Sequence, residues 1–432
     1  MSDFRLDAIL CGIIHGRGEN VEMTNELKEF AETCRRELTE NVLPFWLAHG
    51  WDRKHGGVYT CLDRDGTRMD ATKSVWFQGR FAYVLSFAFN CVTPNAEWLA
   101  AAKSALDFLE RHCFDTHGKM YFEVAADGTP LRMRRYLFSE AFAALAHAEY
   151  AKAVRGTDPA LSAAHTTRAL ELFRRIRAFA PDAARCPPKY EPAGATQGHS
   201  LTMILINVAT ALKQVSDDPI LDAQVDESID RLFRFFVRPE FNCVLETVGP
   251  HGEFIDTCAG RTINPGHGIE TSWFLMDVAR ARGDRALLAQ ALQVLDWQWN
   301  WGWDAEQGGG ILSFRDCRGF PSQTYEQDMK FWWPQCEAII ANLEAYRLTG
   351  EEKWLERFRL ARDWAWAHLK DREYPEWFGY LHRDGTVAQP AKGNLFKGPF
   401  HIPRMLVKCG ELCKENIKET MTWCAKQAWL NL

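Results

Sequence analysis

Helical runs of two kinds alternate along this chain, and the alternation constrains its fold more than any other feature. Six runs have one polar and one apolar face. In "EEKWLERFRLARDWAWAHLK", Trp354, Phe358 and Ala361 share a stripe at helical spacing, with Glu and Arg opposite. Six other runs, such as "SVWFQGRFAYVLSFAFN", are apolar on all sides, and a helix without a polar face is normally buried. The pattern predicts six outer and six inner helices.

A turn-rich phrase follows most of the outer runs. Each phrase contains two short stretches suited to strands around a turn and closes with Asp-Gly or a related pair, which predicts a β-hairpin. The five phrases are "DRKHGGVYTCLDRDG", "DTHGKMYFEVAADG", "RPEFNCVLETVGPHG", "DAEQGGGILSFRDCRG" and "REYPEWFGYLHRDG".

Recurrence of one helix pair with a connecting hairpin predicts a repeat architecture. We expect an all-α (α/α)6 barrel of six inner and six outer helices over residues 23–415, with the hairpins in its connecting loops. The alternative is an open α-solenoid of helix pairs, but six turns with polar clusters at matching ends favour closure. Residues 1–22 and 416–432 form an N-terminal extension and a C-terminal tail without an assigned role.

Charge and cysteine content narrow the class of partner. The formal net charge is −6 and no long basic run occurs, so we expect no nucleic-acid partner. No apolar run reaches the roughly 18 residues of a membrane span, and "AILCGII" lacks the flanks of a signal peptide, so we expect no membrane partner and a cytoplasmic location. Thirteen cysteines without a CxxC pair argue against a disulfide framework or a zinc ribbon.

Polar residues interrupt the inner helices mainly near their first turns. Charged groups in a buried ring are costly unless they are paired, so we expect them to gather at one mouth of the barrel. Tryptophan and phenylalanine residues beside them would give a pocket suited to a sugar ring. The polar residues are Gln78, Arg80, Ser139, Glu140, Asn207, His267, Glu270, Gln335, Glu337, His401 and Arg404, and the aromatic ones are Trp76, Phe77, Trp332, Trp333 and Phe400.

The stretch "NPGHGIETSW" has more than one interpretation. Asn264 and Pro265 suit the start of a helix, so His267 could simply lie in a first turn. His267 and Glu270 also have the spacing of a metal-ligand pair, but no HxxxH or HExxH accompanies them, and we expect no metal. Arg80 could likewise be structural, anchoring its helix through a carboxylate such as Glu140.

Several long phrases carry a resemblance to the N-acylglucosamine 2-epimerase family, in order from about residue 25 to about residue 410. They are "FWLAHGWDRKHGGVYTCLDRDG", "KSVWFQGRFAYVLSFAF", "YLFSEAF", "NPGHGIETSWFLMD", "KFWWPQCEAIIANLEAYRLTGEEKW" and "FKGPFHIPRML". The resemblance implies an (α/α)6 barrel that interconverts N-acetylglucosamine and N-acetylmannosamine, acts as a homodimer and, in some members, is activated by a nucleotide such as ATP. No Walker-type loop occurs in this chain.

Inverting C2 of an open-chain sugar needs one group to remove the C2 proton and another to return a proton from the opposite face. Histidine suits both tasks near neutral pH, and no redox cofactor is required. The resemblance assigns these roles to His267 and His401. It matches Arg80 to an arginine of the family, suited to a developing enediolate, and Glu270 and Glu337 to supporting carboxylates.

We expect the substrate to be a small sugar, bound by Trp76, Gln78, Asn207, Trp333 and Arg404. Gln335 is familiar from disaccharide epimerases, whereas "FKGPFHIPR" resembles the acylglucosamine type, and His199 could lie near the sugar. Three alternatives stay open at this point. They are an epimerase or aldose–ketose isomerase for another sugar of the cellobiose or mannose type, an inverting glycosidase using Glu270 and Glu337, and an interaction protein of the renin-binding kind.

Overall fold

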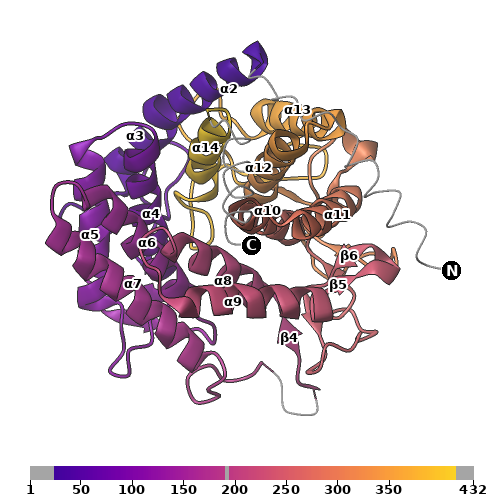
Figure 1. Ribbon diagram of the computed structural model, residues 1–432. Helices are drawn as coiled ribbons and strands as arrows, with labels where there is room; N and C mark the ends of the chain where they lie inside the picture. The colour runs from indigo at the N-terminus through magenta and orange to yellow at the C-terminus, as the bar shows by residue number, and fades with distance from the viewer. Residues whose placement is uncertain (1–23, 190–193, 415–432) are drawn as a thin grey trace, which may run out of the picture.

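The computed structural model describes residues 24–189 and 194–414, and its core is a ring of six helices (Figure 1). Each member contacts the next along the chain, and the last contacts the first, so the ring is closed. The (α/α)6 barrel is therefore confirmed over the open solenoid. The inner helices are α4 (Val75–Cys91), α6 (Phe138–Val154), α8 (His199–Leu212), α10 (Pro265–Arg282), α12 (Trp332–Thr349) and α14 (His401–Leu412).

The outer helices pack over the seams of this ring. For example, α7 lies against both α6 and α8, and α11 lies against α10 and α12. The outer helices are α2 (Asn25–Arg36), α5 (Ala96–His112), α7 (Pro159–Phe179), α9 (Pro219–Arg231), α11 (Arg285–Gly302) and α13 (Glu352–His368). The helical run that starts with α2 continues through a π-helical segment at Glu37–Val42, α3 (Leu43–Phe45) and a second π-helical segment at Trp46–Gly50.

Short strands tie the loops together along one rim of the barrel. A strand just before an inner helix pairs with the loop that follows the next outer helix, giving the antiparallel pairs β1–β2, β4–β7, β8–β9 and β10–β11. Their bounds are β1 (Lys73–Ser74), β2 (Glu123–Val124), β4 (Gln197–Gly198), β7 (Thr247–Val248), β8 (Thr262–Ile263), β9 (Arg315–Asp316), β10 (Lys330–Phe331) and β11 (Tyr380–Leu381).

The hairpin expectation is correct only in part. Three of the phrases take part in hairpins: β2 pairs with β3 (Pro130–Arg132), β5 (Val237–Arg238) with β6 (Cys243–Val244), and β11 with β12 (Val387–Gln389), and β3 and β12 lie just after their phrases. Elsewhere in the phrases a single antiparallel bridge, such as Trp51–Val58 or Trp303–Ile311, replaces a hairpin. The longer pairings join different loops, which a reading of one phrase at a time does not reveal.

Polar side chains in the first turns of three inner helices fasten these loops to the ring. Gln78 accepts a hydrogen bond from Val58 N at 2.7 Å and donates to Val58 O at 2.9 Å. Gln335 makes the same pair of bonds to Ile311, at 2.7 and 2.9 Å. Glu140 accepts from Met120 N at 2.7 Å. The repeat thus extends to side chains that satisfy buried backbone groups of the neighbouring loop.

Buried lysines form a second repeated fastening. Lys73 Nζ lies 2.6 Å from Asp52 Oδ2, and Lys330 Nζ lies 3.2 Å from Asp304 Oδ2, with all four side chains buried. Burial by itself raises the pKa of Asp52, but the bonds from Lys73 and Tyr59 outweigh it and bring the pKa to about 2. These pairs hold the start of a loop to the strand that leads into an inner helix.

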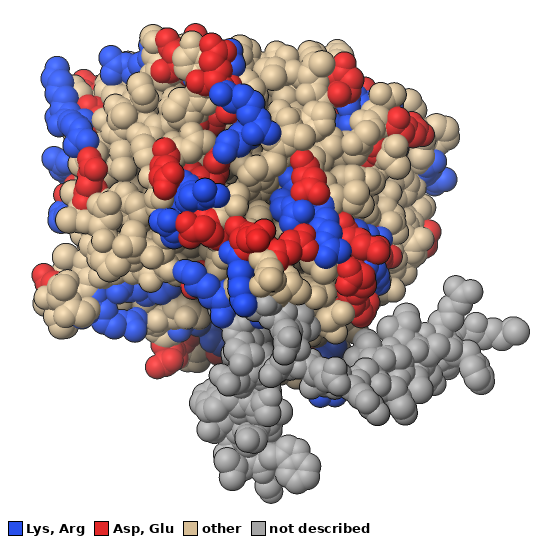
Figure 2. All heavy atoms as spheres, turned by 90° about the horizontal axis from the view of Figure 1, so that it is seen from above, with Lys and Arg blue, Asp and Glu red and all other residues tan. Residues whose placement is uncertain are grey.

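The outside of the barrel carries charges of both signs. Figure 2 shows the molecule turned by 90° about the horizontal axis from the view of Figure 1, so that it is seen from above. On that face, Lys and Arg side chains lie next to Asp and Glu side chains. Glu26 of α2, for example, pairs with Arg359 and Arg362 of α13. No helix among residues 24–189 and 194–414 is long and apolar enough to cross a membrane. The cysteines in these residues are free thiols.

The N-terminal extension, residues 1–22, and the C-terminal tail, residues 416–432, lie outside the described residues. The boundary of the barrel domain at 23–415 therefore stays a prediction at both ends, although the described helices run from Asn25 to Leu412.

Replacing Lys73 by methionine should destabilise the fold. Lys73→Met keeps the side-chain length but leaves the Asp52 carboxylate buried without its ammonium partner, a loss that typically costs about 3–5 kcal/mol. We expect denaturant unfolding at pH 7 to show a decrease of this order in the free energy of unfolding. Lys103→Met is the control, because Lys103 pairs with Asp107 on the surface and should change stability little. Equal effects of the two substitutions would contradict the role of the buried pair.

Candidate active site

The helix start at Asn264 and Pro265 is as expected. Asn264 is the N-cap of α10, and its side chain accepts a hydrogen bond from the His267 backbone at 3.2 Å. Pro265 occupies the first turn, where its missing N–H leaves no intrahelical bond unmade. This start fixes the backbone of His267 at the end of the barrel where the other inner helices also begin.

The imidazole of His267 is held by a carboxylate from outside its own helix. His267 Nδ1 donates to both carboxylate oxygens of Glu246, at 3.0 Å each. A carboxylate is an acceptor, so Nδ1 carries the proton and Nε2 is free of this contact. The His267 side chain is 27% exposed, which leaves it within reach of a small molecule.

Glu246 lies between β6 and β7, and both its backbone N–H and its backbone carbonyl are hydrogen-bonded. Its N–H donates to Thr262 O of β8 at 3.0 Å, and its carbonyl accepts from His199 N, at the start of α8, at 3.0 Å. The ring of His199 is fixed by Thr271, whose hydroxyl donates to His267 O at 2.8 Å and lies 3.1 Å from His199 Nε2. His199 Nδ1 then faces Glu246 Oε1 at 3.5 Å.

A second histidine–carboxylate pair joins α14 to α12. His401 Nδ1 donates to Glu337 Oε1 at 2.8 Å. Arg404 Nη2 donates to the same oxygen at 2.6 Å, and also to Glu270 Oε1 at 2.6 Å. Glu337 Oε2 accepts from Trp273 Nε1 at 2.9 Å. The fully buried Glu337 thus receives hydrogen bonds from three side chains, and Arg404 draws the first turns of α10, α12 and α14 together.

Trp333 lies against both imidazoles. Its ring centroid is 5.0 Å from that of His267 and 5.8 Å from that of His401. The indole packs on Gly266, where an added Cβ would come within 2.6 Å of two ring atoms. Trp333 therefore contacts both histidines and offers a flat apolar surface on which a sugar ring can lie.

The two histidines have opposite pKa shifts. At His267, burial favours the neutral ring, but the charge and hydrogen bond of Glu246, together with the charges of Glu270 and Glu337, outweigh it and raise the pKa above the usual value. At His401, burial and the positive charge of Arg404 act in the same direction and hold the pKa well below the usual value. Environments that separate two pKa values in this way assign one group as the resident acid and the other as the resident base.

Arg80 is buried among aromatic rings and is not paired with Glu140. Its Cζ lies 4.0 Å from the ring centroid of Phe142 and 4.5 Å from that of Trp76. Its Nε is buried without a hydrogen-bond partner in the described structure. Burial, followed by the charge of Arg404, lowers the pKa of Arg80 to about 9. A guanidinium in this condition is suited to an incoming oxygen that carries negative charge.

The contacts or positions of three expected substrate ligands bear on their proposed role. The amide of Gln78 is used entirely by Val58 and by Ser74 O, so it has no group left for a sugar. Arg404 Nη2 is bonded to two carboxylates, so the residue organises the site, while its Nε has no hydrogen-bond partner in the described structure and its contact with substrate stays a prediction. Asn207 lies about two turns into α8, deeper in the barrel than the other candidates. Trp76 and Trp333 remain proposed contacts for the sugar.

Three residues of this arrangement were not anticipated. Glu246 lies in a predicted hairpin, where a glutamate is ordinary, and only the pairing of β7 with β4 and the bond to Thr262 bring it to the site. Trp273 and Thr271 belong to "NPGHGIETSW" and are one turn or more beyond His267. Their spacing from His267 and Glu270 on one helix was the available signal for them.

Two clusters have several ligating atoms close together, and in both of them these atoms already have partners within the protein. They are Glu270, Glu337 and His401, and His199, Glu246 and His267. In the first, the guanidinium of Arg404 already lies between the carboxylates. In the second, both oxygens of Glu246 are bonded to His267.

The close approach of Glu270 and Glu337 also bears on hydrolysis. Both bind the same Nη2 atom, and their ligating oxygens lie within 4.8 Å of each other. An inverting glycosidase needs its two carboxyl groups roughly 6.5–9.5 Å apart, with room for water between them. The geometry therefore does not support the glycosidase alternative.

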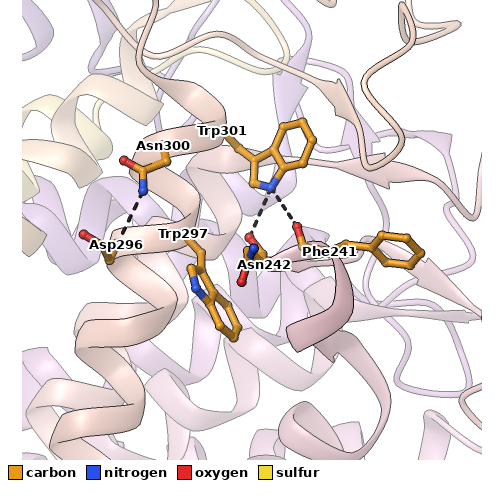
Figure 3. A pocket seen from close by; sticks show the side chains of 6 residues that line it. All are labelled: Phe241, Asn242, Asp296, Trp297, Asn300 and Trp301. Carbon is orange, nitrogen blue, oxygen red and sulfur yellow. Dashed lines mark hydrogen bonds between the residues drawn. The ribbon is translucent and has the colours of Figure 1, made fainter. Parts of the chain in front are cut away.

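A separate hollow of about 380 Å³ lies on the outside of the barrel, between α11 and the β5–β6 loop (Figure 3). Trp301 there donates from Nε1 to Phe241 O and Asn242 O, at 3.2 and 3.1 Å. Asp296 pairs with Arg357 at 2.9 Å. The hollow has aromatic and amide groups but none of the paired histidines found at the barrel mouth.

Known proteins resemble this chain along most of its length. The family model of N-acylglucosamine 2-epimerase matches residues 57–398. The N-acylglucosamine 2-epimerases of Bos taurus and Homo sapiens are 34% and 33% identical over 394 residues; each alignment covers 89% of this chain, and 92% and 90% of those proteins. The solved cellobiose 2-epimerase of Spirochaeta thermophila superposes with a TM-score of 0.77 at 24% identity, covering 91% of this chain and 99% of that one.

Removing the central guanidinium should destabilise the site. Arg404→Met leaves Glu270 and Glu337 buried without their shared cation, and we expect the free energy of unfolding to fall by about 3 kcal/mol or more. The pKa of the His401 imidazole should rise, because a nearby positive charge is lost. Denaturant unfolding and NMR titration of the ring measure the two effects. Adding Glu270→Gln should recover part of the lost stability, and no recovery would argue against charge repulsion as the cause.

Proposed function

The chain belongs to the N-acylglucosamine 2-epimerase family, and we propose that it interconverts N-acetyl-D-glucosamine and N-acetyl-D-mannosamine by moving a proton at C2 of the open-chain sugar. It is an isomerase of the carbohydrate epimerase class. The relatives that carry this name are matched over nine-tenths or more of their own length, so the activity concerns the whole barrel and not a fragment of it.

The observation that carries the proposal is the presence of two histidine–carboxylate pairs whose imidazoles both lie against Trp333. In each pair Nδ1 is bound to a carboxylate, Glu246 for His267 and Glu337 for His401, so each ring is oriented and offers Nε2 to substrate. Epimerisation at one carbon needs this arrangement, because the proton must leave from one face and return to the other.

In the proposed reaction, the neutral histidine takes the C2 proton of the open-chain aldehyde through Nε2. The electron pair of the C–H bond moves toward C1, and negative charge develops on O1. Arg80 is the proposed partner of this enediolate oxygen, because its buried guanidinium has donor capacity left. The protonated histidine then delivers its proton to C2 from the opposite face, which inverts the configuration without any change in oxidation state.

Glu270 is the proposed partner of sugar hydroxyls. Its Oε1 receives the hydrogen bond from Arg404, which leaves Oε2 able to accept from a hydroxyl during ring opening or in the open chain. Trp333 and Trp76 are the proposed apolar surfaces for the sugar carbons. The same set of groups could act on other sugars, so the choice of N-acetyl sugar rests on the named relatives.

Three further properties are proposed from the family resemblance. We propose a homodimer, a cytoplasmic location and modulation by a nucleotide such as ATP that takes no part in the chemistry. Proton transfer between two histidines requires no redox cofactor. Light scattering after size-exclusion chromatography should give a mass near twice the 49.5 kDa of one chain, and a mass of one chain would contradict the dimer.

Deuterium incorporation tests the reaction directly. Incubation with N-acetyl-D-mannosamine in deuterium oxide should produce N-acetyl-D-glucosamine labelled at C2, because the returning proton comes from a group that exchanges with solvent. Proton NMR would show the loss of the C2 signal as the product appears. Folded protein that neither exchanges C2 nor forms the epimer would sink the proposal. If the protein turned over cellobiose or mannose instead, the proposed proton transfer would stand and only the identity of the sugar would change.

Removal of either histidine tests the two-sided mechanism. His267→Ala and His401→Ala should each lower kcat for epimerisation roughly 100- to 10,000-fold, the usual contribution of a general acid or base. Each variant should exchange the C2 proton of at most one epimer, because one face has lost its base. Near-normal epimerisation by either variant, with its fold confirmed by circular dichroism, would remove that histidine from the mechanism.

A further inference from the structure

We propose that Glu246 is the positioning residue that keeps His267 protonated between turnovers, and so decides which of the two histidines starts a reaction cycle as the acid. The inference rests on the proposed epimerase function. Glu246 lies outside the inner helices and contacts the reaction only through His267. Its role follows from three features of the described structure: how it is held, what else it binds, and how it differs from Glu337.

The carboxylate of Glu246 is built into the rim. Backbone hydrogen bonds join Glu246 to Thr262, just before α10, and to His199, at the start of α8. Because β8 leads directly into the helix that carries His267, the carboxylate and the imidazole are placed by the same short segment of backbone. The two equal distances of 3.0 Å from Nδ1 to the carboxylate oxygens show that the ring faces the middle of the carboxylate.

The two histidine–carboxylate pairs differ in their third partner. Glu337 shares its charge with Arg404, which lies 2.6 Å from it and also 3.3 Å from His401 Nδ1. Glu246 has no Lys or Arg among its hydrogen-bond or ion-pair partners in residues 24–189 and 194–414, and its partners are the rings of His267 and His199. The charge of Glu246 is therefore available to His267, whereas that of Glu337 is already compensated.

Other charged groups around His267 either also raise its pKa or affect that pKa less than Glu246 does. Glu270 on the same helix and Glu337 on α12 also favour the imidazolium, but both are joined to Arg404. From the α8 side, His199 faces Glu246 at 3.5 Å, and from α14 His401 lies across Trp333. Among these groups Glu246 has the strongest effect, and with the help of Glu270 and Glu337 it keeps the pKa of His267 above the ordinary value despite burial.

This asymmetry has a consequence for catalysis. The raised pKa of His267 and the lowered pKa of His401 favour His267 as the acid and His401 as the base of the resting enzyme. One sugar epimer can then react at once, and after that turnover the proton has moved from His267 to His401. The enzyme must return the proton to His267 through solvent before the same direction can proceed again. Glu246 sets the equilibrium of that return.

Glu246→Gln tests the proposal, because glutamine keeps the shape and can still accept a hydrogen bond from Nδ1 but carries no charge. Removal of the negative charge lowers the pKa of His267, so the alkaline limb of the kcat/KM profile against pH should move to lower pH by about one to three units. The acid limb, which reports His401, should stay in place. At pH 8 the loss of activity should therefore be much larger than at pH 6.

Direct NMR titration of the His267 imidazole gives a second measurement that needs no substrate. Its pKa should fall in Glu246→Gln and return toward the wild-type value in Glu246→Asp, which restores the charge. Glu110→Gln is the matched control, because Glu110 contacts His147 at 3.1 Å in the outer layer, away from the reacting groups. It should leave both the pH profile and the titration of His267 unchanged.

An unchanged titration of His267 in folded Glu246→Gln would overturn the proposal. So would a uniform loss of activity at all pH values with both limbs in place, because that result indicates a packing role. If the protein fails to epimerise any sugar, the proposed function falls, but the titration still decides whether Glu246 holds the proton on His267.

Discussion

One buried guanidinium holds the candidate site together. Arg404 binds Glu270 and Glu337 from two neighbouring helices, and without it those carboxylates would face each other in a buried place. Its charge also compensates Glu337 and, together with the larger effect of burial, holds the pKa of His401 well below the usual value. The inner ring can carry charged residues at its mouth only because this contact pairs them, and the pairing fixes the relative positions of α10, α12 and α14.

The fold was largely predictable from the sequence, because the apolar pattern repeats with every helix pair. The site was less predictable from the sequence, and Gln78 and Arg80 show why. Residues two apart on a helix are separated by about 200°, so they face nearly opposite sides. Gln78 turns to the loop and binds Val58, while Arg80 turns to the aromatic rings of the mouth. Gln335 and Glu337 divide in the same way. Polarity alone predicts that all four side chains line the pocket. Their positions around the helix axis show instead that the two glutamines face the loops.

Glu246 could not be found in this way, because its position depends on contacts between distant segments. The strand β7 beside it pairs with β4, about fifty residues earlier, and its own backbone bonds to Thr262 and His199. Each bond is ordinary, and the short phrase "VLETVG" would fit any exposed hairpin. A search along helices overlooks such a residue, whereas the rim strands that tie one repeat to the next bring it to the site.

The two halves of the site have the same hydrogen bonds and different electrostatics. In each, a carboxylate holds Nδ1 of a histidine, so geometry alone would make the two rings interchangeable. The difference is that Arg404 lies beside the Glu337 carboxylate, whereas no Lys or Arg among the described residues pairs with the Glu246 carboxylate. A two-sided proton transfer benefits from this inequality, because two equally basic rings would both be neutral or both be charged over much of the pH range. The barrel can therefore orient both imidazoles with one motif, while Glu246 beside His267 and Arg404 beside His401 separate their pKa values.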